Sequence, residues 1–267
     1  MKETVEKEMV ELVWKNILTT GEEKNFGKMR HLMRLIPREP RCKTCNAPFK
    51  GLEGFAVRHL FGKQPSKLNP TVCNACELFA KKHPGGANVE LAMLFADIRG
   101  STALAEKLGD REFSLLIDRF YRAATDVLVR SEALIEKLIG DEVAAMFVPG
   151  FAGRDYARRA VETALQILRV TGHVAGGEPW LPVGVGVHKG PAFVGAVGAR
   201  EKLVEITALG DTVNTAARLA AVAGPGELLV SEEAASAAGI DVRGAEFRSL
   251  ALKGRREPIG VRVLRTS

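Results

Sequence analysis

Two short stretches of the sequence carry acidic side chains in settings that suit catalysis. Asp97 comes near the end of the apolar run VELAMLFADI (89–98), and Asp141 follows Gly140 between two further apolar runs. The first run predicts a buried strand, and the two-residue Gly-Asp connection predicts a hairpin. If the hairpin pairs beside the first strand, both carboxylates lie at one end of the sheet.

Two neighbouring carboxylates repel each other and therefore need protons or cations. Magnesium suits them because it prefers oxygen ligands and bridges to phosphates. The turn after Asp97 adds backbone N–H groups at a helix start, where phosphate binds, from Ile98, Arg99, Gly100, Ser101 and Thr102. These features together predict two-metal chemistry on a nucleoside triphosphate. Taken singly, Asp97 is also typical of a helix N-cap and Asp141 of a turn.

A polar pair lies on the predicted helix TVNTAARLAAVA (212–223). Asn214 and Arg218 stand four residues apart and so share a face. An arginine held beside an asparagine suits a phosphoryl group that gains charge. The same spacing is also typical of a solvated helix face.

All four cysteines lie in the first third of the chain, as Cys42, Cys45, Cys73 and Cys76. They form two C-x2-C pairs with 27 residues between them. Each pair directs two thiolates at one ion, and two pairs complete a tetrahedral site. A reducing cytosol disfavours disulfides. A structural zinc ion, an iron–sulfur cluster and redox-active thiols remain open at this point, and segment 46–72 must carry structure or function of its own.

The remaining patterns predict an α+β fold whose helices pack on a sheet and whose order begins β-α-β-β-α-β. Strands are expected at 89–98, 133–139, 142–148, 181–190, 203–211, 227–230, 246–250 and 259–265, and helices at 3–18, 103–130, 154–171 and 212–223. The expected apolar face of 103–130 contains Leu104, Leu108, Leu115, Leu116 and Phe120. Asp211 is a plausible N-cap for the last helix.

The expected apolar face of helix 3–18 contains Val5, Met9, Leu12, Val13 and Ile17. This helix either packs on its own chain or pairs two subunits. The Pro and Gly residues of KKHPGGAN (81–88) indicate a linker. We therefore expect a helical segment at 1–41, a metal-binding four-cysteine module with linker at 42–88, and a larger domain at 89–267.

Charge is unevenly distributed between these parts. Residues 1–88 carry 16 Lys and Arg against 9 Asp and Glu, whereas residues 89–267 carry 22 against 23. The excess of positive charge in residues 1–88 could serve to bind nucleic acid or an acidic partner, or it could be a solvated basic surface. We favour the surface and expect no nucleic-acid partner, since aromatic and basic residues do not alternate. The sequence shows neither a long apolar run nor a signal region, so we expect no membrane span and a cytoplasmic location.

Four motifs, FADIRGST, EKLIGDEVAAMF, GVGVHKGPAFVGAVG and ALGDTVNTAAR, occur in this order. With them, residues 89–267 resemble the catalytic domain of class III nucleotide cyclases, which has a ferredoxin-like, palm-type fold. The resemblance implies that Asp97, the Ile98 carbonyl and Asp141 hold two Mg²⁺ or Mn²⁺ ions. The turn at 98–102 would hold the triphosphate.

The resemblance also assigns residues to the base and to the transition state. Lys137 and Thr207 match the pair that reads the base, and lysine with threonine is similar to an adenine-selective subgroup. Asn214 and Arg218 match the transition-state pair, and Lys253 matches a lysine that contacts the terminal phosphates. The implied activity is adenylate cyclase, which converts ATP to 3′,5′-cyclic AMP and pyrophosphate.

In this family the metal-binding residues of one site and its base-reading and transition-state residues come from different chains. The resemblance therefore implies a head-to-tail homodimer with shared sites, and the cysteine module is the expected regulator. Ser101 stands where the family often has an aromatic residue, and Arg99 is an extra cation. Alternatives are a catalytically silent nucleotide-binding or zinc-dependent interaction module, a guanylate cyclase, and a diguanylate cyclase suggested by GDEV at 140–143.

Overall fold

The computed structural model describes residues 2–21, 26–36, 40–67, 70–198, 204–255 and 257–266. The chain divides into two compact units. The first, here called the cysteine unit, comprises residues 1–89, 148–153 and 192–209. The second, here called the sheet unit, comprises residues 90–147, 154–191 and 210–267. The chain therefore passes between the units several times, and strands as well as loops carry it across.

Strands of both units join one sheet, whose order is β2-β3-β1-β4-β6-β8-β7, with β5 paired to β4. The strands are β1 (Gly85–Ile98), β2 (Leu134–Ile139), β3 (Glu142–Phe147), β4 (Val183–Gly198), β5 (Val204–Leu209), β6 (Leu228–Ser231), β7 (Glu246–Leu250) and β8 (Ile259–Leu264). β1 and β3 are antiparallel neighbours, and so are β2 and β3. The expected order β-α-β-β-α-β and the α+β class are confirmed.

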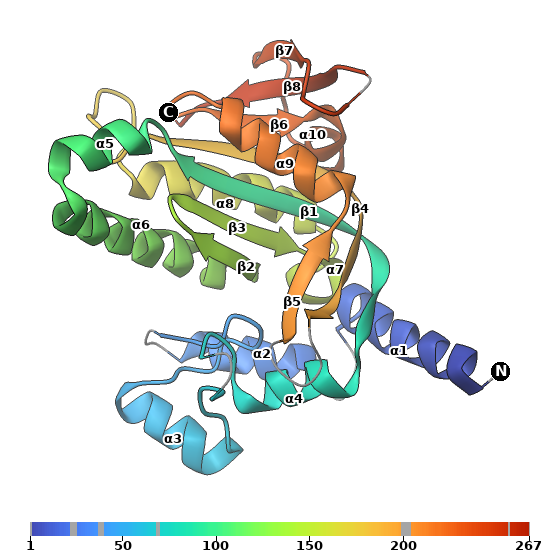
Figure 1. Cartoon of the computed structure of the whole chain (residues 1–267). Helices are drawn as coiled ribbons and strands as arrows, with labels where there is room; N and C mark the ends of the chain where they lie inside the picture. Colours follow the sequence, from blue (N-terminus) through green and yellow to red (C-terminus); the bar gives the residue numbers. More distant parts are fainter. Residues whose placement is uncertain are drawn as a thin grey trace. The chain divides into compact units, whose positions relative to one another are not determined.

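The helices of the sheet unit are α5 (Ser101–Leu108), α6 (Asp110–Arg130), α8 (Tyr156–Val170), α9 (Asp211–Val222) and α10 (Glu232–Ala238). Figure 1 shows α8 behind the sheet and α9 in front of it. α6 packs on α8 and on β2, and α10 packs on α8. Large side chains between these layers are fully buried, among them Leu91, Met93, Phe120, Phe147 and Ile167.

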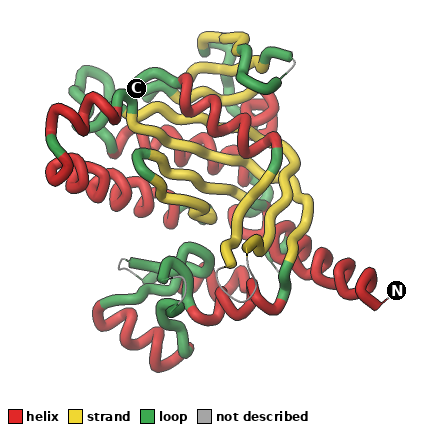
Figure 2. Tube along the Cα trace, viewed as in Figure 1, coloured by secondary structure: helices red, strands yellow, loops and turns green. Residues whose placement is uncertain are grey.

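The cysteine unit is mostly helical, as Figure 2 shows by colour. It contains α1 (Lys2–Thr19), α2 (Phe26–Leu35), α3 (Gly51–Phe61), α4 (Asn74–Lys82) and α7 (Pro149–Ala152), with β5 and the adjoining ends of β1 and β4. α3 lies inside segment 46–72, which therefore carries structure, as the long cysteine spacing indicated. None of the helices in the described ranges combines the length and apolar character needed to span a lipid bilayer.

α1 packs on its own chain. Trp14 is 2% exposed, and its indole N–H donates to the His83 carbonyl at 2.9 Å. The Trp14 ring also meets Phe79 edge-on, with ring centroids 5.4 Å apart. Of the predicted apolar face, Ile17 is buried, Met9 and Leu12 are exposed, and the side chain of Val5 lies outside the described residues. The buried stripe therefore centres on Trp14, which the prediction did not include.

Several element boundaries differ from the prediction. The expected helix 103–130 is two helices, because Gly109 adopts a left-handed φ of +77°. The break changes the helical phase, so the predicted core residues Leu108 and Leu115 are exposed, at 40% and 53%. β1 begins at Gly85, inside the expected linker, and β4 runs on to Gly198.

The expected strand 203–211 is β5, although Leu203 lies outside the described residues. The expected N-cap of α9 is wrong. Gly210 holds that position without a side-chain cap, and Asp211 is the first helical residue.

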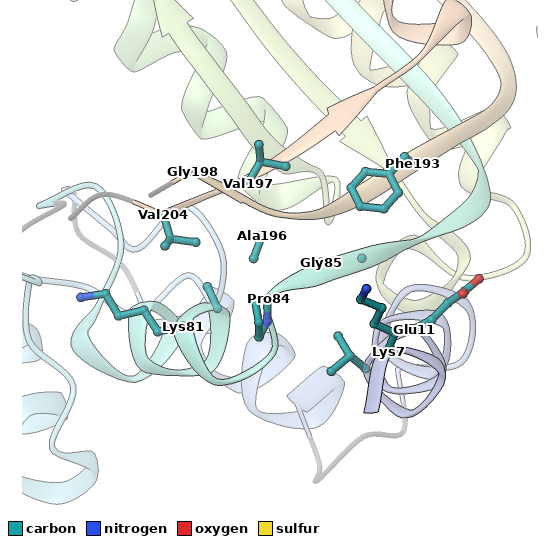
Figure 3. Close-up of a pocket in the computed structure, with 13 residues that line it drawn as sticks. Lys7, Glu11, Lys81, Pro84, Gly85, Phe193, Ala196, Val197, Gly198 and Val204 are labelled. Atoms are coloured by element: carbon teal, nitrogen blue, oxygen red, sulfur yellow. The ribbon is translucent and has the colours of Figure 1, made fainter. Parts of the chain in front are cut away.

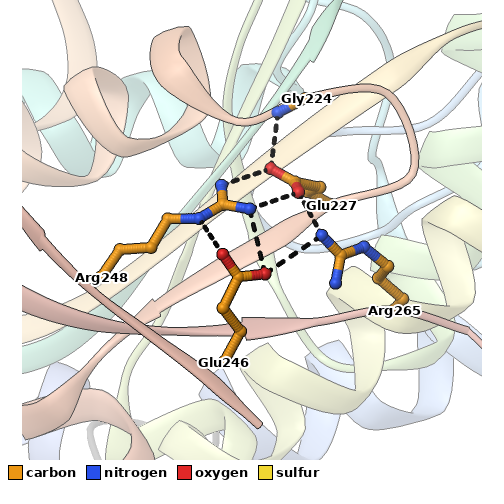
Figure 4. Close-up of polar contacts among 5 residues, drawn as sticks. All are labelled: Gly224, Glu227, Glu246, Arg248 and Arg265. Carbon is orange, nitrogen blue, oxygen red and sulfur yellow. Dashed lines mark hydrogen bonds and ion pairs between the residues drawn. The ribbon is translucent and has the colours of Figure 1, made fainter.

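Glu227 lies just before β6 and contacts the Gly224 turn, residues of β7 and the segment that follows β8 (Figure 4). Both terminal nitrogens of the Arg248 guanidinium donate to the Glu227 carboxylate at 2.8 Å, and the Gly224 N–H donates to it at 3.0 Å. Arg265 completes the set from the chain end, and Glu246 contacts both arginines. The bond from Arg248 lowers the pKa of Glu227 to about 2, with help from Gly224 and Arg265 against the cost of burial.

This depressed pKa predicts a stability that depends on pH. Ionised Glu227 stabilises the fold fully above its unfolded pKa of about 4.3, and this stabilisation is lost as pH falls toward 2. Glu227→Gln should lower the free energy of unfolding by about 1–3 kcal/mol at pH 7, and the deficit should shrink between pH 5 and pH 2.5. Denaturant unfolding at several pH values measures both effects.

Asp241→Asn is the matched control, since Asp241 and its partner Arg243 have side chains 62% and 90% exposed. This control should leave the free energy of unfolding at pH 7 nearly unchanged. A Glu227→Gln deficit that is equally small, or that does not change with pH, would contradict a stabilising role for the cluster.

Candidate functional site

The structure brings the two predicted carboxylates to one end of the sheet. Asp97 is the penultimate residue of β1 and pairs across the sheet with Glu142, the first residue of β3. Asp141 directly precedes Glu142 in the turn between β2 and β3. The backbone N–H of Ile98 donates to the Asp141 carbonyl at 3.1 Å and closes the ladder at this end. The antiparallel register thus holds both acidic residues in place.

The site is short of positive charge. Burial raises the pKa of Asp97, the Arg99 guanidinium opposes that shift, and Asp141 adds to it. Burial also raises the pKa of Glu142, again with contributions from Asp97 and Asp141. Sequence reasoning did not include Glu142, although its place directly after Asp141 was visible. The carboxylates of Asp97, Asp141 and Glu142 together provide oxygen donors of the kind that bind divalent metal ions such as Mg²⁺ or Mn²⁺.

Arg99 supplies a positive charge beside Asp97. Its guanidinium forms an ion pair with the Asp97 carboxylate and donates to the Ala221 carbonyl at 2.6 Å, at the end of α9. Its backbone N–H donates to the Pro182 carbonyl at 2.8 Å. Arg99 therefore neutralises Asp97 and connects it to α9, in a place where a metal ion would compete with it.

The turn after Asp97 suits an anion. Gly100 adopts a left-handed φ of +68°, and α5 begins at the next residue, Ser101. Apart from Gly100 and its two neighbours in the chain, no heavy atom of the described residues lies within 4 Å of the place where a Cβ on Gly100 would stand. A glycine here thus keeps the helix start open, so the first N–H groups of α5, at Ser101 and Thr102, can meet a phosphate.

α9 carries Asn214 and Arg218 and is seated directly on β4. A Cβ on Gly186 would stand 2.4 Å from the Ala220 nitrogen, and one on Gly184 would stand 2.7 Å from the Ala223 carbonyl oxygen. The alternating glycines of VGVGV therefore let the helix approach the sheet backbone. Asn214 is exposed and Arg218 is half-buried, one turn apart.

The turn that contains Lys253 lies against Arg218. A Cβ on Gly254 would stand 3.3 Å from a terminal nitrogen of the Arg218 guanidinium. Arg255 fastens this turn to α9, since it donates to the carboxylate of Asp211 at 3.1 Å and to the hydroxyl of Thr215 at 2.9 Å. Sequence reasoning missed Arg255, although the basic run KGRRE could have drawn attention to it.

Lys137 and Thr207, the predicted base-reading pair, belong to different units, and each is described in its own. Lys137 lies on β2 beside a register shift, with a side chain 44% exposed and 3.9 Å from the carboxylate of Glu136. A bulge of this kind re-aims a side chain. Thr207 lies on β5 opposite Gly195 and is 7% exposed.

The four cysteines form one buried cluster in the cysteine unit. Their sulfur atoms all lie within 4.8 Å of one another, and all four are thiols rather than disulfides. Cys42 and Cys45 flank a tight turn, Cys73 is the N-cap of α4, and Cys76 lies in its first turn. This arrangement could hold a metal ion.

Comparison with known proteins gives a consistent picture. The family model described as adenylate and guanylate cyclase catalytic domain matches residues 86–262. The uncharacterized protein Rv1318c of Mycobacterium tuberculosis is 33% identical over 220 residues, which is 80% of this chain and 39% of that protein. The chain thus spans well under half the length of this relative.

Solved structures show the same likeness. The guanylyl cyclase Cya2 matches with a TM-score of 0.60 and 27% identity, over 68% of this chain and 95% of that one. The adenylyl cyclase CyaB of P. aeruginosa matches with a TM-score of 0.57 and 26% identity, over 67% and 96%. The residues matched by the family model, 86–262, include both Asp97 and Asp141.

The ion pair between Arg99 and Asp97 generates a testable expectation about metal binding. Arg99→Gln should tighten Mn²⁺ binding about threefold to fivefold, because it removes a competing cation from a partly buried carboxylate. Electron paramagnetic resonance of free Mn²⁺ during titration measures this affinity. Arg130→Gln removes an exposed arginine on α6 and should leave it unchanged. Unchanged or weaker binding in Arg99→Gln would show that Arg99 does not compete with metal.

Proposed function

Because the chain belongs to the family of adenylate and guanylate cyclase catalytic domains, we propose that it converts ATP to 3′,5′-cyclic AMP and pyrophosphate. The observation that carries the proposal is the carboxylate pair. Asp97 and Asp141 meet at the end of β1, beside a helix start that glycine leaves open. This combination provides metal ligands and a phosphate cradle side by side.

Asp97, the Ile98 carbonyl and Asp141 would hold two Mg²⁺ or Mn²⁺ ions. When bound, such ions lower the pKa of the ribose 3′-hydroxyl and neutralise the phosphate oxygens. Arg99, which pairs with Asp97 in this structure, would be available to contact the triphosphate once a metal ion takes its place. The N–H groups at the start of α5 hold the triphosphate in the orientation for an in-line displacement.

In that displacement the ribose 3′-hydroxyl releases its proton to solvent, the 3′-oxygen forms a bond to the α-phosphorus, and the bond from that phosphorus to the pyrophosphate oxygen breaks. Negative charge grows on the α-phosphoryl oxygens. Arg218 stabilises this charge, Asn214 orients the substrate beside it, and Lys253 contacts the terminal phosphates. One such contact contributes about 3–4 kcal/mol to transition-state stabilisation. Arg255 positions the Lys253 turn against α9 and so acts through its neighbours.

Preference for adenine rests on Lys137 and Thr207. The ammonium of Lys137 donates to a ring nitrogen, and the hydroxyl of Thr207 accepts from the 6-amino group. Guanine carries a hydrogen on N1, where adenine has an acceptor nitrogen, so the Lys137 ammonium favours ATP, and the Thr207 hydroxyl, which can accept as well as donate, is compatible with the adenine amino group. The matched solved structures include cyclases of both specificities by their names.

The chain carries one copy of each residue set, and we place the two sets of one site on different chains. The functional unit is then a head-to-tail homodimer with two equivalent sites. The four-cysteine module lies outside the matched residues 86–262 and is the natural place for regulation. A cytoplasmic location, where ATP is plentiful, remains part of this proposal.

The proposal predicts a specific product. Purified protein with Mn²⁺ should form cyclic AMP from ATP faster than cyclic GMP from GTP, as chromatography of the products measures. Asp97→Ala should lower turnover at least about 100-fold, because it removes a ligand of both ions. Thermal unfolding of the variant checks that the fold is intact.

Asp126→Ala is the matched control, since it removes an exposed carboxylate of α6 and should leave turnover unchanged. Full activity in well-folded Asp97→Ala would refute the metal role of Asp97. A faster reaction with GTP would refute the adenine preference but leave the cyclase reaction in place.

A further inference from the structure

The spacing of the four cysteine sulfurs distinguishes one metal ion from a cluster. All four sulfurs lie within 4.8 Å of one another, and those of Cys45 and Cys73 are 3.7 Å apart. Zinc–sulfur bonds of about 2.3 Å at tetrahedral angles separate the sulfurs by about 3.8 Å. In an iron–sulfur cluster the four thiolates are divided among two or more iron atoms, so sulfurs on different irons stand farther apart. The geometry fits a single tetrahedral ion.

The site is closed on every side. The four cysteines are at most 3% exposed, which leaves no open coordination position for water or substrate. Backbone N–H groups of Cys45 and Cys73 donate to the Cys42 sulfur at 3.5 and 3.2 Å. The Lys63 ammonium donates to the Cys45 sulfur at 3.7 Å. A closed sulfur site with such outer contacts is structural rather than catalytic.

Charge and packing both call for a cation at this place. Four buried sulfurs within 4.8 Å of one another are costly as thiolates without a counter-ion. The surrounding core is small, and its buried members are Met33, Ala47, Phe49, Val57 and the cysteines themselves. A module with so little apolar core depends on a metal ion or a disulfide for stability.

α4 passes the effect of the ion to the sheet. Two ligands belong to this helix, Cys73 at its N-cap and Cys76 in its first turn. Its far end leads through Pro84 into β1, and its side packs on β5, the strand of Thr207.

Figure 3 shows how closely these elements approach. Lys81 of α4 and Pro84 line one side of an open cavity of about 550 Å³, and Ala196 of β4 and Val204 of β5 line the other. The start of β1 also lies directly against β4, since a Cβ on Gly86 would stand 2.2 Å from the Val194 carbonyl oxygen.

We propose that Cys42, Cys45, Cys73 and Cys76 bind one Zn²⁺ ion, which fixes α4 and through it the position of β5. Zinc is the metal of choice because it binds sulfur tetrahedrally and stays inert in a reducing environment. The ion thus acts as a structural clamp on the strand that carries Thr207. This inference concerns folding and metal binding, and it stands whether or not the cyclase reaction is as proposed.

The metal itself is tested by element analysis and absorbance of the full chain. The expected result is one zinc per chain and no visible absorption. Titration with an organomercurial should release that zinc after about four equivalents, one for each thiolate. Visible iron–sulfur bands, or less than about one tenth of an equivalent of zinc, would overturn the assignment.

The clamp is tested by hydrogen exchange of the full chain before and after zinc release. Amides of α4 and β5 should exchange about tenfold faster or more without zinc, while those of β7 and β8 should not change. Cys76→Ser should reproduce this pattern, and Lys82→Ala, an exposed change on the same helix, should not. If Cys76→Ser does not fold, the zinc-released wild type gives the answer. Unchanged exchange in β5 would overturn the clamp and leave the zinc assignment intact.

Discussion

Repulsion between the carboxylates of Asp97 and Asp141 at the end of β1 is the interaction on which the rest of the sheet unit depends. The antiparallel register of β1 and β3 places Asp97 opposite Glu142, with Asp141 next to it in the chain, so repulsion among the carboxylates is built into the strand pairing. The arginine that relieves it, Arg99, comes from the turn that also opens α5. One short stretch therefore supplies the acid, its counter-ion and a helix start whose N–H groups suit an anion.

The rest of the sheet unit positions a second set of residues. Glycines in β4 let α9 approach the backbone, and Arg255 fastens the Lys253 turn beside Arg218. Arg99 reaches the last turn of α9 through the Ala221 carbonyl, so the counter-ion of Asp97 also contacts α9. In the cysteine unit, α4 carries two of the four thiols and packs on β5. Thr207 and the four cysteines thus lie in the cysteine unit, whereas Asp97, Asp141, Asn214 and Arg218 lie in the sheet unit.

Structural features that depend on neighbours in the sequence could be predicted from the sequence, and features that depend on packing between distant residues could not. Alternating or continuous apolar runs predicted every strand of the sheet, and the Gly140-Asp141 turn predicted the hairpin that carries Asp141. The break at Gly109 was missed because a single glycine inside an apolar repeat does not reveal its φ, and Leu108 and Leu115 were assigned to the core as a result. Arg255 and Glu142 were missed because their roles come from partners distant in sequence or across a strand pair.

Assembly of one site from two chains is the claim on which the account depends most, and mixed dimers test it directly. Chains with Asp97→Ala and chains with Arg218→Ala are each expected to be inactive alone. After unfolding, mixing in equal amounts and refolding, half of the dimers are mixed and each has one intact site, so activity should recover to about one quarter of the wild-type value. Mass spectrometry of differently tagged chains confirms that mixed dimers are present. Absence of recovery in their presence would contradict the shared site.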